Sequence, residues 1–453
     1  MKSSVVLAVV LLVAVATTPL VQSGENDASD WPMFGRDLAN TSYTPNPGPS
    51  VLSIRWRFPQ EPDYLPSEIW SVPAVVNGVI YFGTGATEVE SFTPGLLARL
   101  GKSVIALNAE NGDVMWHNDQ LGTFAFSSPA VVDGRVFIAS DQGNAYALNA
   151  ENGDVIWNRD LISGPENLAW RISSPAVTDG KVLITTQLGY TYALNVENGD
   201  IIWARKVDEH VQTSPAVAGG KLFITSDNIG WSGHLSALNA GNGNLVWIYP
   251  IDNDLFGSSP TVAYGKVFVV TKKGWIHAVY AENGGLAWKY GMGEGAYYIR
   301  PDGPPAAAHG MIYVFKNPPT DERVHTLLAL NADNGSVVWE SLPSWAGLRV
   351  IVADNVIFAG WHLSELWMLD AYTGNLLQKI KLSVPDGLSV VGDKLYVTSH
   401  GRFVACIGLP ETGAEVESPK TNLLPWLAIL GLLLIGVVGL LSFVIKIRLL
   451  RRR

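Results

Sequence analysis

The sequence predicts an all-β fold, an eight-bladed β-propeller of four-stranded antiparallel blades closed by an N-terminal strand. A signal peptide is predicted before it and one transmembrane helix after it. The first observation is a repeat, "SSPAVVDGRVFIASDQGNAYALNAENGDVIW" at 127–157 and "SSPAVTDGKVLITTQLGYTYALNVENGDIIW" from 173. The second is that two kinds of tight turn alternate along the chain, and the third is an N-terminal strand that resembles the last strand of a repeat. Periods of about 20–50 residues are typical of solenoids, propellers and arrays.

The first kind of turn joins two alternating apolar runs and occurs eight times. Most of these turns carry glycine, asparagine or aspartate, which tolerate the positive φ that two-residue hairpin turns require. They lie at Asn77-Gly78, Asp133-Gly134, Asp179-Gly180, Gly219-Gly220, Tyr264-Gly265, His309-Gly310, Asp354-Asn355 and Gly392-Asp393.

The second kind of turn occurs seven times, as Asn-Gly at 111, 152, 198, 242, 283 and 334 and as Thr373-Gly374. A short strand follows each of these turns, and we expect it to be the outermost strand of a blade. Its last position is Gln378 in the seventh case and tryptophan in the others, at Trp116, Trp157, Trp203, Trp247, Trp288 and Trp339.

The mismatch between eight first turns and seven second turns predicts how the ring closes. The last repeat, from Gly387 to about Leu409, ends after three strands. The missing fourth strand stands at the other end of the chain, in Ser53–Phe58, with Trp56 at the tryptophan position. A ring closed in this way leaves only short outer strand edges.

The two ends of the chain predict its topology. A charged start, a brief apolar run and small residues predict a secretory signal peptide over 1–23. Residues 423–445 carry no charge, and at about 1.5 Å per residue they can cross a hydrocarbon core of about 30 Å. The basic tail 446–453 should stay in the cytoplasm. We therefore expect a single-pass type I protein of the cell membrane.

Between these ends we expect one propeller domain over 31–410 and a polar stalk over 411–422, both outside the cytoplasm. The formal net charge of −10 argues against a nucleic-acid partner, which would require clustered lysine and arginine. Cys406 is the only cysteine, so the chain cannot form an intrachain disulfide. Because Cys406 stands in an alternating apolar stretch, we expect it to be a small buried hydrophobic residue. The eight histidines are scattered and match no metal or catalytic motif.

The repeat core, Ala147–Trp157, has close copies that start at Ala106, Ala193, Ala237, Ala278 and Ala329. Its A-x-[ND]-A-x-[NT]-G-x-x-x-W spacing resembles the tryptophan-docking motif of the PQQ-repeat, or quinoprotein-like, propellers. The segment Asp30–Asp37, DWPMFGRD, also resembles the opening of that superfamily. The resemblance implies that seven tryptophans have a structural docking role, namely Trp56, Trp116, Trp157, Trp203, Trp247, Trp288 and Trp339.

The resemblance implies either an enzyme or a scaffold, because a fold does not determine a function. Several alcohol dehydrogenases of this superfamily place a disulfide of adjacent cysteines against the quinone, and carry Ca²⁺ ligands and a catalytic aspartate on long insertions. This chain has one cysteine and little length beyond eight blades. We therefore expect the non-catalytic, BamB-like branch, a binding or scaffold protein without a cofactor, for a protein or glycan partner at the cell surface. The alternative is a membrane-bound dehydrogenase of alcohols or sugars that uses PQQ with Ca²⁺.

A binding surface is predicted on one rim of the central channel, where the chain enters each innermost strand. Tryptophan, tyrosine and arginine are enriched at binding hot spots. The same segments could instead plug the channel, and the sequence leaves both possibilities open. The candidate rim residues are Trp170, Arg171, Tyr298, Arg300, Trp345 and Arg349.

Two N-glycosylation sequons, at Asn40 and Asn334, are compatible with export. Asn334 also occupies one of the Asn-Gly turns, which favours an incidental match at that position. Nothing comparable favours or disfavours Asn40.

Overall fold

The structure is a computed structural model that describes residues 30–60, 65, 69–85, 100, 103–122, 124, 127–161, 172–211, 213–227, 232–251, 258–292, 303–316, 324–345, 347–361, 364–399 and 403–409. Residue contacts divide the chain into two compact units, residues 1–409 and 410–453, and every described residue belongs to the first. The predicted signal peptide, stalk, transmembrane helix and basic tail lie outside the described residues. In the described ranges, no helix has the length and hydropathy that crossing a membrane requires.

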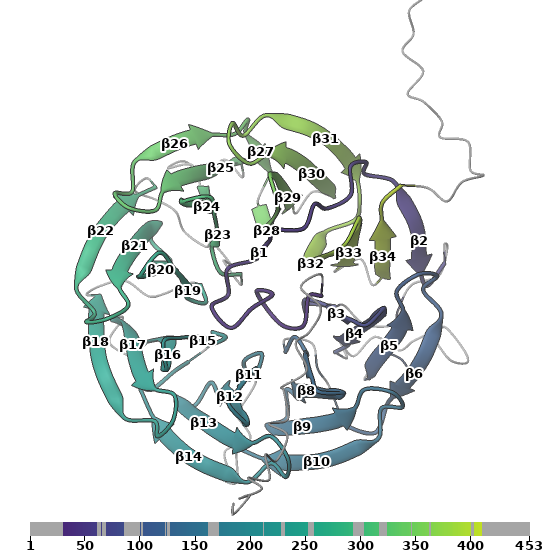
Figure 1. Ribbon diagram of the computed structural model, residues 1–453, viewed down its shortest axis with the longest axis vertical. Helices are drawn as coiled ribbons and strands as arrows, with labels where there is room; N and C mark the ends of the chain where they lie inside the picture. Colours follow the sequence, from purple (N-terminus) through teal and green to yellow (C-terminus); the bar gives the residue numbers. More distant parts are fainter. Residues whose placement is uncertain are drawn as a thin grey trace, which may run out of the picture. The chain divides into compact units, whose positions relative to one another are not determined.

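Eight antiparallel sheets form a ring of blades around one axis (Figure 1). In blades 1 to 7 the four main strands follow one another in the chain from the innermost to the outermost position. This arrangement confirms the predicted eight-bladed propeller. Two blades carry an extra short strand, because β27 (Ser344–Trp345) pairs with β25 and β1 (Tyr43–Thr44) pairs with β28.

The first four blades have nearly the same strand lengths. Blade 1 contains β3 (Ala74–Val76), β4 (Val79–Gly83), β5 (Val104–Asn108) and β6 (Val114–Asn118). Blade 2 contains β7 (Ala130–Val132), β8 (Arg135–Ala139), β9 (Asn144–Asn149) and β10 (Val155–Asp160). Blade 3 contains β11 (Ala176–Thr178), β12 (Lys181–Thr185), β13 (Tyr190–Asn195) and β14 (Ile201–Lys206). Blade 4 contains β15 (Ala216–Ala218), β16 (Lys221–Asp227), β17 (Gly233–Asn239) and β18 (Leu245–Ile251).

The innermost strand is longer in the last two blades. Blade 5 contains β19 (Thr261–Ala263), β20 (Lys266–Val270), β21 (Trp275–Tyr280) and β22 (Leu286–Gly291). Blade 6 contains β23 (Ala306–Ala308), β24 (Met311–Lys316), β25 (Val324–Asn331) and β26 (Val337–Glu340). Blade 7 contains β28 (Gly347–Ala353), β29 (Val356–Trp361), β30 (Glu365–Asp370) and β31 (Leu376–Lys381). Blade 8 contains β32 (Pro385–Val391), β33 (Lys394–Ser399), β34 (Phe403–Ile407) and β2 (Ile54–Phe58).

Blade 8 joins the two ends of the propeller. Its outermost strand is the N-terminal β2, which pairs antiparallel with the C-terminal β34 so that Trp56 lies opposite Cys406 and Phe58 opposite Val404. The colours of Figure 1 show this junction, with β2 in purple beside β34 in yellow-green. Closure by the N-terminal strand is therefore confirmed.

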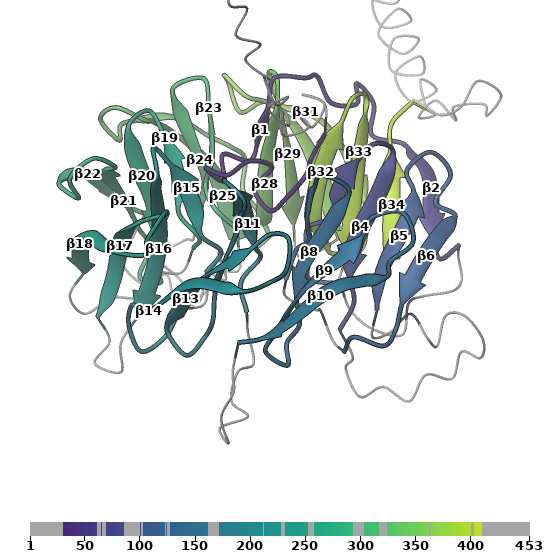
Figure 2. The same ribbon diagram turned by 60° about the horizontal axis from the view of Figure 1, so that its bottom comes forward.

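The alternating strand directions give the ring two different faces (Figure 2). The first and third connections of each blade lie on one face, which we call the turn face. The second connection and the link to the next blade lie on the opposite face, which we call the loop face.

The core consists of apolar layers between neighbouring blades. Strand β8 shows the principle, because Val136 and Ile138 pack with blade 1 while Phe137 and Ala139 pack with blade 3. Successive side chains of a strand point to opposite faces of its sheet. Both faces of each blade are buried, so the middle strands are continuous apolar runs rather than alternating ones.

Candidate functional site

Seven tryptophans connect each of seven blades to the blade that follows it. Every one of these indoles donates a hydrogen bond from Nε1 to a backbone carbonyl in the third connection of the next blade. The bonds are Trp56 to Ala109 (3.3 Å), Trp116 to Ala150 (2.8 Å), Trp157 to Val196 (3.0 Å), Trp203 to Ala240 (3.3 Å), Trp247 to Ala281 (3.3 Å), Trp288 to Ala332 (3.0 Å) and Trp339 to Ala371 (3.0 Å).

Each of these indoles also covers the glycine of the turn that it contacts. Gly199, for example, has a φ of 70°, and a Cβ placed on it would lie 2.6 Å from Cε3 of Trp157. Glycine is therefore required twice, for its backbone conformation and for the close approach of the ring. The described tryptophans of this set act in packing between blades.

The junction between blades 7 and 8 uses a different contact. Blade 8 has no continuous third connection, because its outermost strand is supplied by the N-terminal β2, so an indole from blade 7 would have no glycine turn to cover. Gln378 occupies the tryptophan position of β31 and binds the backbone of Leu52 just before β2. Its Oε1 accepts from the Leu52 N–H (2.8 Å), and its Nε2 donates to the Leu52 carbonyl (3.4 Å).

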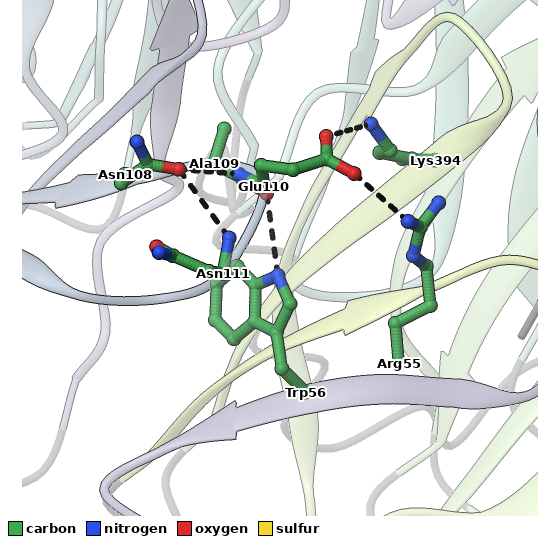
Figure 3. Close-up of polar contacts among 7 residues, drawn as sticks. All are labelled: Arg55, Trp56, Asn108, Ala109, Glu110, Asn111 and Lys394. Atoms are coloured by element: carbon green, nitrogen blue, oxygen red, sulfur yellow. Dashed lines mark hydrogen bonds and ion pairs between the residues drawn. The ribbon is translucent and has the colours of Figure 1, made fainter. Parts of the chain in front are cut away.

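An ionic contact accompanies the closure of the ring (Figure 3). Glu110, in the third connection of blade 1, binds Arg55 of β2 at 2.9 Å and also binds Lys394 of β33. The hydrogen bond from Lys394, followed by the two positive charges, lowers the pKa of the Glu110 carboxyl. One carboxylate of blade 1 thus contacts both the N-terminal and the C-terminal part of blade 8, beside the Trp56 indole.

The N-terminal segment, residues 30–44, crosses the middle of the ring (Figure 1). The innermost strands have no neighbouring strand toward the axis, and this segment accepts hydrogen bonds from their free N–H groups in six blades. Pairing with sheet edges of this kind removes unsatisfied backbone groups. The bonds join Trp31 to Val75, Pro32 to Val131, Leu38 to Val217, Ala39 to Val262, Thr41 to Ala307 and Ser42 to Val352.

The structure describes only part of the predicted rim. Trp170, Arg171, Tyr298 and Arg300 lie outside the described residues. Trp345 belongs to β27, where its backbone pairs with Val324. The rim as a joint binding surface therefore stays a prediction.

Arg349, the sixth rim residue, is only 6% exposed. Its Nε donates a hydrogen bond to the Asp386 carbonyl (2.9 Å), and its guanidinium carbon lies 5.3 Å from the ring centre of Phe34. Phe34 comes from the segment that crosses the axis and is itself buried. In this structure Arg349 packs inside the ring and connects β28 to β32, which agrees with the alternative that these segments plug the channel.

A group of aromatic side chains on the turn face departs from the repeat. We call Tyr43, Tyr264, His309 and Tyr372 the aromatic cluster. The ring centre of His309 lies 5.5 Å from that of Tyr43 and 5.0 Å from that of Tyr372. The Tyr264 hydroxyl accepts a hydrogen bond from the Gly310 N–H (2.9 Å), which connects the turn of blade 5 to the turn of blade 6.

Two members of the aromatic cluster have a positive φ, which is unfavourable for tyrosine, whereas histidine tolerates it better. Tyr264 and His309 are the first residues of the first turns of blades 5 and 6, with φ values of 51° and 54°. The other six first turns begin with asparagine, aspartate or glycine, which tolerate positive φ better. Bulky residues in this region store backbone strain, and such residues gather at functional sites.

Two members of the cluster are exposed to solvent. Tyr264 is 44% exposed and Tyr372 is 49% exposed. Burial raises the pKa of the Tyr43 hydroxyl, with further contributions from Asp354 and Tyr372, and burial also raises the pKa of Tyr264. The phenols of Tyr43 and Tyr264 are therefore neutral at physiological pH. This chemistry suits recognition rather than nucleophilic catalysis.

The sequence contains a signal for this cluster. At the first position of the eight first turns, Tyr264 and His309 are aromatic, whereas the other six turns have asparagine, aspartate or glycine. Tyr372 departs in the same way, because the other second turns have glutamate, aspartate or glycine at that position.

Two other reactive side chains, Cys406 and His277, are buried in packing positions. Burial raises the pKa of the Cys406 thiol to about 12, so the thiol stays protonated and a poor nucleophile. Burial lowers the pKa of His277 to about 4, and the Tyr249 hydroxyl lies 3.0 Å from its Nδ1. Within the described ranges, no three His, Cys, Asp or Glu side chains are grouped as a metal site needs.

Comparison with known families places the repeat in one of them. A family model described as outer membrane protein assembly factor BamB matches residues 53–249 and 209–416, most of the chain. No curated protein sequence matches this chain significantly.

Solved structures share the fold at low sequence identity. BamB from Moraxella catarrhalis aligns with a TM-score of 0.60 and 15% identity, over 81% of this chain and 100% of that one. Quinohemoprotein alcohol dehydrogenase from Comamonas testosteroni aligns with a TM-score of 0.66 and 16% identity, over 86% of this chain and 83% of that one. A europium-containing methanol dehydrogenase aligns with a TM-score of 0.64 and 14% identity, over 82% of this chain and 89% of that one. At such identities the likeness shows the fold alone.

Proposed function

The chain belongs to the family described as outer membrane protein assembly factor BamB, and on this premise we propose that it is a membrane-anchored, extracytoplasmic and non-catalytic binding protein. The propeller acts as a scaffold that presents the aromatic cluster to a protein partner. The family description names an assembly factor, and this supports a partner that is itself a protein.

The aromatic cluster is the observation that carries this proposal. Packing between blades requires the docking tryptophans and their glycines, but it does not require Tyr264 and Tyr372 to expose their rings. Tyrosine supplies a large, rigid contact area at interfaces and is enriched at hot spots. Backbone strain at Tyr264, combined with the exposure of Tyr264 and Tyr372, supports a role of these side chains in binding.

The proposed location depends on the two ends of the chain. Residues 1–23 have the pattern of a secretory signal peptide, and 423–445 have the length and hydropathy of a transmembrane helix followed by a basic tail. The rim on the loop face is proposed as a second contact region, with its exposed residues still to be located.

The alternative is a dehydrogenase that uses PQQ with Ca²⁺. A calcium ion takes about 6–8 oxygen ligands, several of them carboxylates. The described residues contain no such group, and the axis carries the N-terminal segment, with Phe34 against Arg349. Within the described ranges this chain therefore offers the ion no set of carboxylate ligands, and this observation supports the non-catalytic proposal over the dehydrogenase.

Site-specific photo-crosslinking in intact cells tests the proposal. A benzophenone amino acid replaces Tyr372 in the full-length chain, and in a matched variant it replaces Tyr190, which is 37% exposed at the loop-face end of β13. We expect a crosslinked protein adduct from position 372 and none from position 190. The double variant Tyr264→Ala/Tyr372→Ala should bind the crosslinked partner at least about thirtyfold more weakly. This factor corresponds to about 2 kcal/mol of binding free energy lost at a hot spot.

Two results would contradict the proposal. Equal crosslinking from both positions would show that the turn face has no special role. Robust dye-linked turnover of alcohols or sugars after addition of PQQ and Ca²⁺ would establish the dehydrogenase instead.

A further inference from the structure

We infer that Asn334 is an N-glycosylation site of this protein and that Asn40, the other sequon, is not. This inference rests on the proposed extracytoplasmic location, because the sugar donor and the transferase act outside the cytoplasm or in the export pathway. It reverses the sequence-based expectation, which favoured an incidental match at Asn334.

Asn40 is unable to carry a glycan in the folded propeller. Its side chain is 3% exposed, and its Nδ2 donates hydrogen bonds to the carbonyls of Pro215 and Pro260, both at 3.1 Å. The Asn40 carbonyl also accepts from the Thr261 hydroxyl. A sugar on Nδ2 would displace the N-terminal segment from blades 4 and 5, so molecules modified there would fail to fold.

Asn334 has the opposite environment. It lies in the third connection of blade 6, between β25 and β26, on the turn face. Both Asn334 and Ser336 are exposed there. Its Oδ1 accepts a hydrogen bond from the Ser336 N–H (2.9 Å), which holds the turn without any contribution from Nδ2. A bulky polar group on Nδ2 would extend into solvent and break no contact of the described fold.

Comparison with the equivalent turns shows how the site arose. In blades 1 to 3 the asparagine Nδ2 binds an aspartate two residues later, from Asn111 to Asp113 (2.7 Å), Asn152 to Asp154 (2.7 Å) and Asn198 to Asp200 (2.8 Å). Blade 6 has Ser336 in place of that aspartate, and among the described residues Asn334 Nδ2 has no hydrogen-bond partner. Blades 4 and 5 also lack the aspartate, with Asn244 and Gly285 in its place, so only blade 6 combines its absence with the serine that completes an Asn-Gly-Ser sequon.

The modification is a glycosyl transfer from a phosphate-activated sugar donor of the exporting cell. The Asn334 amide nitrogen loses a proton and forms a bond to the anomeric carbon. The bond between that carbon and the phosphate oxygen breaks, and the phosphate leaves with the electron pair. The product is an N-linked glycan on the turn face.

Glycopeptide mass spectrometry of the full-length protein, purified from cells whose other exported proteins carry N-linked glycans, tests the inference. We expect a glycan on the peptide that contains Asn334 and none on the peptide that contains Asn40. Ser336→Asp restores the turn chemistry of blades 1 to 3, so it should abolish the modification while the fold is kept. Asp154→Ser creates the matched sequon in blade 2 and should add a glycan at Asn152.

Surface biotinylation of intact cells separates failure of the inference from failure of the proposed location. A biotinylated protein with an unmodified Asn334 would overturn the inference and leave the location intact, whether or not Asn152 of the Asp154→Ser variant is modified. A glycan on Asn40 of folded protein would also overturn it. A protein that no surface reagent reaches would overturn the proposed location and the inference together.

Discussion

Replacement of Trp157 by alanine tests whether the docking contacts hold the blades together. The indole is 7% exposed, donates to the Val196 carbonyl at 3.0 Å, and lies 6.0 Å from the Phe137 ring. Burial of a tryptophan side chain removes about 150–250 Å² of its surface from water. At about 25 cal/mol per Å², this burial contributes at most about 4–6 kcal/mol to the free energy of unfolding. Truncation of buried tryptophan typically costs about 3–5 kcal/mol. We therefore expect Trp157→Ala to lower the free energy of unfolding by about 4 kcal/mol.

The assay is equilibrium urea unfolding of the propeller, followed by far-UV circular dichroism so that the lost indole does not affect the signal. Trp275→Ala is the matched control, because Trp275 is 37% exposed and the Lys289 Nζ lies 5.0 Å from its ring centre. An exposed cation–π contact contributes about 0.5–1 kcal/mol. Trp157→Phe, which keeps a ring but loses the N–H, should fall between the two.

Equal midpoints for Trp157→Ala and Trp275→Ala would refute this reasoning. The same holds if Trp157→Phe is as damaging as the alanine variant, because the hydrogen bond would then outweigh the packing area. A changed slope of the unfolding free energy against urea would mean that blades separate one at a time rather than together.

Four further changes test other parts of the structure. Deletion of residues 51–58 should abolish cooperative unfolding, because β2 completes blade 8, and a deletion variant that melts like the parent would contradict closure. Glu110→Ala should cost only about 0–1 kcal/mol, because its side chain is 57% exposed, and a larger loss in urea would assign the ionic contact a main role in closure. His277→Gln should reduce acid sensitivity. The pKa of His277 is about 4 in the folded protein and 6.5 in the unfolded chain, so the unfolded chain binds the proton more tightly. The free energy of unfolding is therefore unaffected above pH 6.5 and falls by up to about 3 kcal/mol as the pH drops to about 4. Parallel pH–stability curves for parent and variant would exclude this effect. Tyr264→Asn should raise stability by up to about 1 kcal/mol, because asparagine adopts its φ of 51° more readily, and a lower melting temperature would show that the ring is needed for packing.

The repeat made the fold predictable from the sequence. Its period, the eight first turns and the seven second turns gave the number of blades, and the surplus strand around Trp56 gave the closure. These signals are local and occur many times, so an error at one position does not change the count. The family was recognised for the same reason, because the motif that ends in Trp157 recurs at constant spacing.

Contacts that occur only once were not predictable in this way. The N-terminal segment has no periodic pattern, yet Leu38 binds Val217 and Ser42 binds Val352, far away in the sequence. Arg349 was expected on an exposed rim because arginine is common at interfaces, but its 6% exposure reflects contacts with Phe34 and Asp386 that no local pattern encodes. Each of these contacts joins residues that are far apart in the sequence and that only the closed ring brings together.

Departures from the repeat separate into two kinds once the structure is known. Gln378 replaces the docking tryptophan because blade 8 offers no glycine turn for an indole to cover. Its two hydrogen bonds to the Leu52 backbone explain the glutamine within the fold. Tyr372 departs as well, but its ring is 49% exposed, and no packing requirement of blade 7 explains a tyrosine there rather than the glutamate of other turns. Tyr372 and Tyr264 also have partners within the fold, since the Tyr372 ring lies 5.0 Å from that of His309 and the Tyr264 hydroxyl accepts from the Gly310 N–H, but large parts of both side chains stay exposed. Exposure beyond what these contacts require is the reason that we propose the turn face as the binding face.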